Sequence, residues 1–357
     1  MALAIYLIGA PGSGKSEVFN ALTMTTTGPH SSSKGPHQIG SVKVPDDRMT
    51  RLREMYHPKK YTPAEVTFLD VAPPRGRDGT AGLGKLTEVL SEADAFALVV
   101  QCFGGLDYRG QPVDPCAQME SVLLELIVTD LEKVERRLER IKKEKRSNAK
   151  VVSSTEIDIL NRFLVQLEAG KPLRDVEIRA DEERHIRHYQ FLSIKPILIV
   201  ANVSEDAAEQ DGATAMEKDA VEQGMGFIRF CAPLESEIAQ LDDDMRTEFM
   251  RDYHIETPAR DLLIQEAYGL LNLISFFTVG EDEVRAWTVP DSATAYEAAG
   301  KIHSDIQRGF IRAETISSTV LLDTGTWAAC RDHGTLRLEG KEYRVRDGEV
   351  IHFRFNV

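Results

Sequence analysis

Cysteine is scarce in this sequence of 357 residues: only Cys102, Cys116, Cys231 and Cys330 are present. They form neither a CxxC pair nor the cysteine and histidine spacing of a zinc site. A disulfide framework of the kind found in small secreted domains is therefore excluded. A chain of this length buries enough apolar surface for two or three domains without such cross-links. We expect a reduced, cytoplasmic protein.

Long hydrophobic runs are absent as well. No apolar stretch approaches the roughly 18 residues that a membrane-spanning helix needs. The N-terminus lacks the basic segment of a signal peptide and runs directly into a glycine-rich turn. Hydrophobic residues make up 42% of the chain and charged residues 28%, so wholesale disorder is also excluded. These features predict a soluble globular protein with no membrane partner.

Positive charge is in deficit, with 43 Lys and Arg against 57 Asp and Glu and a net charge of -14. The surface as a whole should not adhere to DNA or to anionic lipid, so any nucleic-acid contact must be local. One such place is the segment from Lys133 to Lys150, which holds nine basic residues and three glutamates. It predicts a contact with a phosphate backbone, such as that of ribosomal RNA. A solvated helix face is the alternative.

Five short apolar runs recur along the first 232 residues, at 3–8, 65–71, 95–103, 196–203 and 226–232. Their apolarity is continuous rather than alternating, which is typical of strands buried on both faces. Helix-like segments separate them. The pattern predicts an α/β domain with a parallel sheet.

A long insertion separates the third and fourth of these runs. Its apolar residues recur at spacings of three and four, the pattern of two helices that pack as an antiparallel hairpin. The two stripes are Ile127, Leu131, Val134, Leu138 and Ile141, then Ile157, Leu160, Leu164 and Leu167. The sequence leaves open whether this arm is a packing device or a contact surface for a partner.

The last eighty or so residues change character. The segments 283–289, 334–345 and 349–357 favour strands, with turn signals at Glu339-Gly340 and Asp347-Gly348 and one helical stretch from Ala295 to Ile302. This pattern predicts a small α+β module. For its aromatic residues Trp287 and Phe353, burial in a β core is favoured over stacking on RNA.

The first apolar run leads into a phosphate-binding motif. Gly9, Gly14, Lys15 and Ser16 satisfy G-x-x-x-x-G-K-[ST], with a predicted strand before the motif and helical sequence after it. Glycines let successive N–H groups converge on an anionic oxygen at a helix N-terminus. Lys15 should reach the β- and γ-phosphates and stabilise charge in the transition state, and Ser16 should ligate magnesium. A relic loop that binds nothing is the alternative.

Two further strand ends carry candidate ligands. Asp70 ends the second predicted strand, where it would hold Mg²⁺; a strand-end cap is the alternative. Asn202, Val203 and Glu205 follow the fourth strand, in the place where guanine-selective relatives have Asn-Lys-x-Asp. The lysine and aspartate of that guanine clamp are replaced. ATP is therefore the expected nucleotide, and GTP is disfavoured.

At this point the sequence resembles the YchF family, also called Obg-like ATPases, over nearly its whole length. The resemblance rests on the phosphate loop with FNALT at 19–23, VPDDRM at 44–49, GLGKL at 82–86, the segment 113–140, ANVSED at 201–206, and the C-terminal segments around 283–289, 298–314 and 344–357. The C-terminal group is similar to the TGS domain, a β-grasp module.

The resemblance implies a P-loop NTPase domain at 1–125 and 190–274, a coiled-coil helical insertion at 126–189 and a TGS-like domain at 275–357. Family members prefer adenine nucleotides, hydrolyse them slowly and associate with ribosomes. Carried over by position, the nucleotide-binding residues are Ala10, Pro11, Gly12, Ser13, Gly14, Lys15, Ser16, Glu17, Asn202, Val203 and Glu205, with Cys231, Ala232 and Pro233 beside the purine. For Cys231, a place in the core is an equal alternative.

The sequence also departs from the family pattern. The second switch normally reads Asp-x-x-Gly, but Pro73 stands at the glycine position and has no N–H to give to the γ-phosphate. Losing such a charge-assisted hydrogen bond costs roughly 1.5–3 kcal/mol. The first switch, at 23–40, lacks the family's aromatic segment and magnesium-binding threonine. Thr25, Thr26, Thr27 or a nearby serine could substitute, and the sequence does not select among them. No catalytic base can be assigned, and hydrolysis is expected to be very slow or absent.

Three functions therefore stay open. The leading hypothesis is a magnesium-dependent ATPase, expected to be a monomer, that contacts a ribosomal partner through its arm and TGS-like domain. A nonenzymatic adaptor that uses the same surfaces is the second, favoured by Pro73 and the degenerate first switch. A GTPase is the third, disfavoured by Val203 and Glu205. A small-molecule kinase would share the loop, but the arm and the β-grasp module argue against it.

Overall fold

The computed structural model describes residues 4–24, 37–71, 86–146, 153–205 and 211–356. Pro73 and the three threonines at 25–27 lie outside these ranges. The chain divides into two compact units. The first comprises residues 1–40 and 67–262, and the second comprises residues 41–66 and 263–357. Each unit has its own six-stranded sheet.

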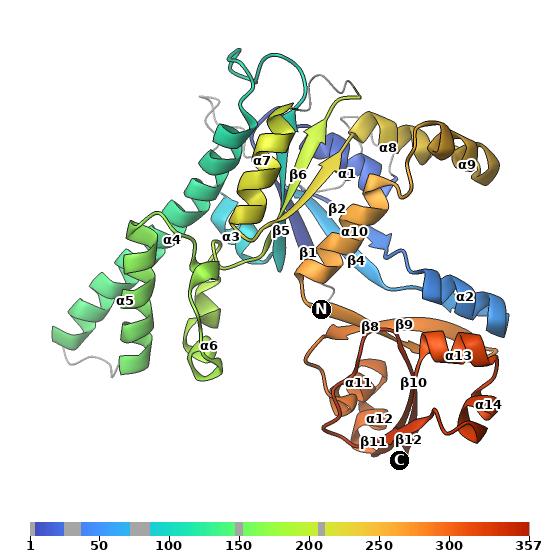
Figure 1. The fold of residues 1–357 in the computed structure, drawn as a ribbon. Helices are drawn as coiled ribbons and strands as arrows, with labels where there is room; N and C mark the ends of the chain where they lie inside the picture. The colour runs from blue at the N-terminus through green and yellow to red at the C-terminus, as the bar shows by residue number, and fades with distance from the viewer. Residues whose placement is uncertain (1–3, 25–36, 72–85, 147–152, 206–210, 357) are drawn as a thin grey trace. The chain divides into compact units, whose positions relative to one another are not determined.

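The sheet of the first unit has the strand order β2-β4-β1-β5-β6-β7 (Figure 1). Its strands are β1 (Ala4–Ile8), β2 (His37–Lys43), β4 (Glu65–Val71), β5 (Ala95–Cys102), β6 (Ile197–Val203) and β7 (Gly226–Phe230). The pairs from β4 through β7 are parallel, and every residue of β5 and β6 is buried. The five strands predicted from continuous apolar runs, and the α/β fold class, are confirmed. The sequence did not predict β2, in which Val42 is the one buried residue of the strand.

Helices pack against this sheet through apolar side chains. Met119 and Leu126 of the long helix α4 and Met216 of α7 join strand residues in one core cluster. The bounds of these and the remaining helices are α1 (Lys15–Thr23), α3 (Thr87–Ser91), α4 (Pro115–Arg146), α7 (Asp211–Glu222), α8 (Ala232–Ile238), α9 (Asp243–Asp252) and α10 (Ala259–Leu270). In open α/β sheets, ligands bind outside the carboxyl ends of the strands.

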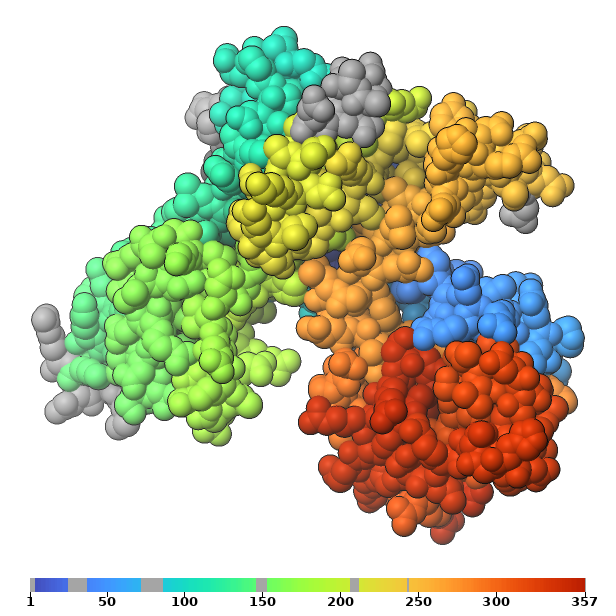
Figure 2. Space-filling view, in the orientation of Figure 1, coloured from blue at the N-terminus to red at the C-terminus, as the bar shows by residue number. Residues whose placement is uncertain are grey.

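The predicted helical arm is present, and α4 runs into it without a break. This 32-residue helix packs against α5 (Ser154–Glu168), and the arm is completed by η2 (Leu173–Asp175), α6 (Ala180–Ile186) and η3 (Arg187–Tyr189). Figure 2 shows α5 and α6 against each other in green. Among the described helices, including α4, none is long and apolar enough to cross a membrane.

The two predicted stripes form most of the arm's core. Of the predicted residues, Ile127, Val134, Leu138, Ile141, Leu160 and Leu167 are buried, whereas Leu131, Ile157 and Leu164 are partly buried. The sequence missed Ile159 and Phe163, which are both 0% exposed. Phe163 packs edge-on against Phe191 with ring centroids 5.4 Å apart. The buried face of α5 therefore includes Ile159 and Phe163 in place of the predicted Ile157 and Leu164, because α5 also packs on α6 and on the chain that leads to β6.

The second unit contains a mixed sheet with the order β11-β10-β12-β8-β9-β3. Its strands are β3 (Lys60–Thr62), β8 (Leu273–Thr278), β9 (Glu283–Pro290), β10 (Phe310–Ser317), β11 (Arg337–Glu339) and β12 (Glu349–Phe355). Its helices are α2 (Asp47–Tyr56), α11 (Ala295–Ile302), α12 (Ser304–Arg308), α13 (Ser318–Thr324) and α14 (Trp327–Asp332). The predicted α+β module is confirmed, with a helix at the expected residues, and Phe353 is buried in its core.

Segment 41–66 groups with the C-terminal unit, whereas the expected boundaries place it in the nucleotide-binding domain. The reason is strand pairing: β3 lies parallel to β9, with Tyr61 opposite Val284. Lys59 N also donates to Glu281 O at 3.0 Å. The division after residue 262 falls within α10, earlier than the expected boundary at 275.

A buried carboxylate ties the arm to the chain that enters β6. Asp130 of α4 is 0% exposed. It accepts hydrogen bonds from Leu192 N at 2.9 Å and from Ser193 N and Ser193 Oγ at 2.7 Å each. Burial raises the pKa of Asp130, although the three hydrogen bonds oppose the shift.

We expect Asp130→Ala to destabilise the protein, because its donors would be left buried without an acceptor. The free energy of unfolding should fall by about 1–3 kcal/mol for each such donor, measured by urea denaturation. Glu135→Ala removes an exposed carboxylate from the same helix and should change stability by less than about 0.5 kcal/mol. Equal losses in the two variants would contradict the assigned role of Asp130.

Candidate functional site

The glycine-rich loop lies where the sequence places it, between the end of β1 and the start of α1. Gly12 and Gly14 have φ angles of 79° and 81°, in the left-handed region that glycine adopts without strain. Ser13 N donates to Ala10 O at 3.2 Å and closes the loop, and Val18 N donates to Gly14 O at 2.9 Å and starts the helix. No side chain caps the N-terminus of α1. Its first N–H groups are therefore available to an anion.

Asn202, at the end of β6, braces this loop. Its side-chain amide donates to Ser13 O at 3.0 Å, and the residue is 2% exposed. A Cβ on Gly14 would collide with the Asn202 amide nitrogen, and a Cβ on Gly9 would collide with Val99 O. Glycine is therefore required at both positions by close packing. The structure gives Asn202 a contact with the loop, where the sequence suggested a contact with the base.

Lys15, Ser16 and Asp70 converge beside the loop. The Lys15 ammonium forms an ion pair with Asp70 and donates to Val71 O at 3.0 Å. Ser16 Oγ donates to Asp70 Oδ2 at 2.6 Å. The pairing of Leu7 with Asp70 in the β1–β4 ladder sets this geometry. Burial lowers the pKa of Lys15 to about 8, and the ion pair favours its charged form, so the ammonium persists at neutral pH.

These residues fit a polyphosphate and a magnesium ion. A serine hydroxyl and a carboxylate are the hard oxygen donors that Mg²⁺ prefers, and this ion commonly takes few protein ligands beside substrate phosphates. The described part of the chain holds no group of three or more His, Cys, Asp or Glu that could bind a metal by itself. Ser13 Oγ is buried without a hydrogen-bond partner among the described residues, which leaves a donor inside the loop.

The residues expected beside the base are only partly brought together. β6 and β7 pair in parallel, with Asn202 opposite Phe230, so Val203 ends β6 and Cys231 directly follows the end of β7. Both side chains belong to the sheet's core cluster. Burial, with a smaller contribution from the Glu205 carboxylate, raises the pKa of Cys231. A purine at these strand ends would therefore meet Glu205 or backbone groups.

The other expected residues differ in exposure. Ala232 is buried at the start of α8, whereas Pro233, Pro11 and Glu17 are exposed. Ala10 is half-buried.

Sequence reasoning missed Tyr108 and Arg109, which follow β5. A Cβ on Gly12 would lie 3.4 Å from Tyr108 Cβ, so this tyrosine lies against the phosphate loop. Arg109 Nε donates to Tyr108 Oη at 2.7 Å, and the guanidinium stacks on its ring. Gln101 holds the segment by donating to Phe103 O and Leu106 O. The one available signal was position, because the segment follows a buried strand at the edge of the sheet that carries the loop.

A parallel sheet with a glycine-rich loop between β1 and α1, and a carboxylate at the end of the neighbouring strand, defines a P-loop NTPase. Comparison with known proteins identifies the family. A protein named "Ribosome-binding ATPase YchF" from Bacillus subtilis (strain 168) is 40% identical over 370 residues, covering 100% of both chains. The protein of that name from Escherichia coli O157:H7 is 37% identical, covering 98% of both chains. The chain belongs to the YchF family.

Two further comparisons agree. Residues 273–356 match the family model YchF-GTPase_C, described as "Protein of unknown function (DUF933)". The structure of the Schizosaccharomyces pombe YchF GTPase superposes with a TM-score of 0.82 at 27% identity, covering 99% of this chain and 97% of that one.

Gly14→Ala tests the packing of the loop. Alanine in the left-handed conformation costs about 1–2 kcal/mol, and its Cβ would also displace Asn202. We expect the free energy of unfolding to fall by at least this amount in urea denaturation. Gly105→Ala is the matched control, because a Cβ there meets nothing within 4 Å. If Gly14→Ala were as stable as the control, the close approach of Asn202 would be wrong.

Proposed function

We propose that this chain binds ATP in preference to GTP, with Mg²⁺, and hydrolyses it slowly while associated with the ribosome. The observation that carries the proposal is the convergence of Lys15, Ser16 and Asp70 beside the uncapped N-terminus of α1. The relatives named ribosome-binding ATPase support the activity and the partner. Val203 and Glu205 support adenine, because they replace the guanine-binding side chains.

Different residues of the chain would bind the phosphates, hold magnesium and stabilise the charge of the transition state. The loop N–H groups would hold the phosphates, with Asn202 keeping the loop in shape. Ser16 and Asp70 would hold magnesium, which when bound neutralises phosphate oxygens. The Lys15 ammonium would pass from Asp70 to the β- and γ-phosphate oxygens and offset the charge that develops as water attacks the γ-phosphate in line. No residue is assigned as the base.

The arm would supply the ribosomal contact, although part of its basic segment serves the arm itself. Lys133 Nζ donates to Gln190 O at 3.2 Å, and Arg137 pairs with Glu156 at 2.8 Å. Arg140, Lys142 and Lys145 are exposed along the last turns of α4. We propose that these three side chains meet the RNA backbone and that the C-terminal unit, as a TGS-like domain, provides a second contact. A cytoplasmic monomer is consistent with this role.

A nonenzymatic adaptor is the second candidate. Proline at position 73 favours it, because proline lacks the N–H that the switch glycine would give to the γ-phosphate. In such an adaptor the nucleotide would be structural, and the arm and the C-terminal unit would do the binding.

Lys15→Ala should abolish binding of Mg-ATP in calorimetry, because the variant loses the Lys15 ammonium, which lies beside Asp70 and can reach the phosphates. Its melting temperature should fall, because Asp70 is 4% exposed and loses its cationic partner, so circular dichroism first checks that the variant is folded. Unchanged ATP affinity in a folded Lys15→Ala variant would refute the role of the loop.

In the parent, GTP should displace labelled ATP poorly, and tighter binding of GTP would overturn the adenine preference.

Single-turnover hydrolysis separates an ATPase from an adaptor. The parent, with ribosomes present, should release phosphate from ATP faster than Lys15→Ala does. Release no faster than from that control would favour the adaptor, provided that calorimetry still detects bound ATP.

The affinity for ATP should depend on pH. The pKa of Lys15 in the free chain is about 8, and bound phosphates favour the charged ammonium. The complex therefore keeps the proton that the free chain loses as the pH rises. Above pH 8 the affinity should fall, approaching tenfold per pH unit, in calorimetry between pH 7 and 9.5. Lys15→Arg stays charged throughout and should bind without this slope; an equal slope in both would assign the titration elsewhere.

A further inference from the structure

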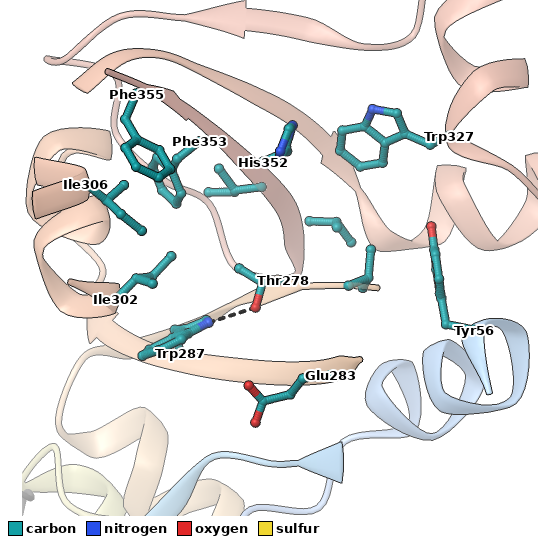
Figure 3. Close-up of a pocket in the computed structure, with 13 residues that line it drawn as sticks. Tyr56, Thr278, Glu283, Trp287, Ile302, Ile306, Trp327, His352, Phe353 and Phe355 are labelled. Atoms are coloured by element: carbon teal, nitrogen blue, oxygen red, sulfur yellow. Dashed lines mark hydrogen bonds between the residues drawn. The ribbon is translucent and has the colours of Figure 1, made fainter. Parts of the chain in front are cut away.

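A cavity of about 480 Å³ lies within the C-terminal unit, and none of its lining residues is among those discussed above as nucleotide-binding. Such volumes are typical of ligand sites. Figure 3 shows its two walls. Ile302, Ile306 and Trp287 lie on one side, and Tyr56 and Trp327 lie on the other.

The cavity lies where two strands of the sheet part. β12 continues to Phe355, but its parallel ladder with β8 consists of the single pair Val350 and Phe277. β8 ends one residue later, at Thr278. Among the described strands, β12 has only β10 and β8 as neighbours. The last residues of β12 therefore have no strand beside them on the β8 side.

The hydrogen bonds at the ends of β12 indicate which peptide groups face this gap. In the residues that flank β12, Ser318 N donates to Gly348 O and Asn356 N donates to Gly309 O, both at 2.9 Å; Gly348 N, in the turn before the strand, donates to Ser275 O. Even-numbered residues of β12 thus direct their peptide groups toward β10. Because peptide groups alternate sides along a strand, those of Phe353 and Phe355 face the gap. An open strand edge of this kind pairs with an extended polypeptide.

The two walls suit alternating apolar side chains. Phe353 belongs to one core cluster with Trp287, Ile302 and Ile306. His352 lies on the opposite face of β12, because successive side chains alternate. An extended peptide that pairs with the open edge of β12 would direct its side chains alternately to the two walls. The polar groups between the walls are already bonded within the chain: Trp287 Nε1 donates to Thr278 Oγ1 at 2.9 Å, and Thr62 Oγ1 donates to Glu283 Oε1 at 2.7 Å.

The charged residues that neighbour or contact the lining residues, called the rim here, carry a small excess of positive charge. Beside β12, the single carboxylate of Glu314 faces Arg354, Arg331 and His352. On the other wall, Lys59 and Lys60 are neutralised by Asp282 and Glu283, while the Arg285 guanidinium stacks on Trp287 at 3.9 Å. This balance favours acidic residues at the ends of an occupant. The cations beside β12 already contact Glu314, which makes a run of RNA phosphates a poorer match.

We propose that this cavity is a peptide-binding slot, in which a partner protein adds an extended, alternating apolar segment with acidic flanks to the open edge of β12. The backbone edge provides the affinity of strand addition, the two apolar walls select side chains, and the rim selects the flanking charge. Nucleotide binding by the other unit is not required.

Selection from a phage library of random decapeptides on the full-length chain, without nucleotide, tests the proposal. Enriched peptides should alternate apolar residues and carry Asp or Glu at an end. Synthetic fluorescein-labelled copies are then titrated by anisotropy. Phe355→Asp, in the slot, should weaken binding at least tenfold. Leu338→Asp, on the outer edge strand β11, is the matched control and should stay within twofold, because both residues are exposed apolar side chains of one sheet.

Hydrogen exchange on the parent chain labelled with ¹⁵N-phenylalanine gives a readout that needs no variant. The amides of Phe353 and Phe355 should exchange fast alone and become protected by the selected peptide. The proposal is overturned if no peptide is enriched, if the two variants bind the peptide equally well, or if these amides stay unprotected. It is also overturned if labelled decauridine binds the parent and Phe355→Asp abolishes that binding, because the slot would then bind nucleobases.

Discussion

The close approach of Asn202 to Gly14 is the constraint on which the nucleotide site depends. The Asn202 amide donates to Ser13 O and occupies the space that a side chain at position 14 would need. This contact joins the end of β6 to the loop that follows β1. It fixes where α1 begins, and therefore where its uncapped N–H groups and Lys15 lie. Lys15 and Ser16 can then reach Asp70, which the β1–β4 ladder brings alongside.

That arrangement gives Lys15 two alternative partners. Its ammonium pairs with Asp70 in this structure, and phosphate oxygens would compete for the same charge. Transfer of the ammonium to the phosphates would break its ion pair with Asp70, so that pair cannot shape the loop once nucleotide is bound. The loop is thus held in shape by Asn202 and by the glycine conformations rather than by the ion pair. The Lys15 ammonium and the Asp70 carboxylate are therefore free to exchange partners, the first for phosphate oxygens and the second for magnesium.

The sequence predicted what local pattern determines. Continuous apolar runs indicated the five parallel strands, helical spacing indicated the arm, and the motif spacing indicated the loop. What it missed depends on contacts between distant residues. The sequence did not predict β10, because its buried positions include the charged residue Glu314. That burial is tolerated because Arg354 and His352 of β12 face Glu314. Segment 41–66 joins the C-terminal unit through β9, and Tyr108 lies against Gly12; no motif signals either contact.

Buried polar contacts also link the arm to the phosphate loop within the first unit. Asp130 fixes α4 to Leu192 and Ser193, which precede β6, and the far end of β6 carries Asn202. Every residue of β6 is buried, so a displacement of the arm at Asp130 would act on a packed strand rather than on a loop. Contiguity alone is not energetic coupling. It does mark one continuous packed route, from Asp130 along β6 to Asn202, which removal of Asp130 would interrupt without touching the loop.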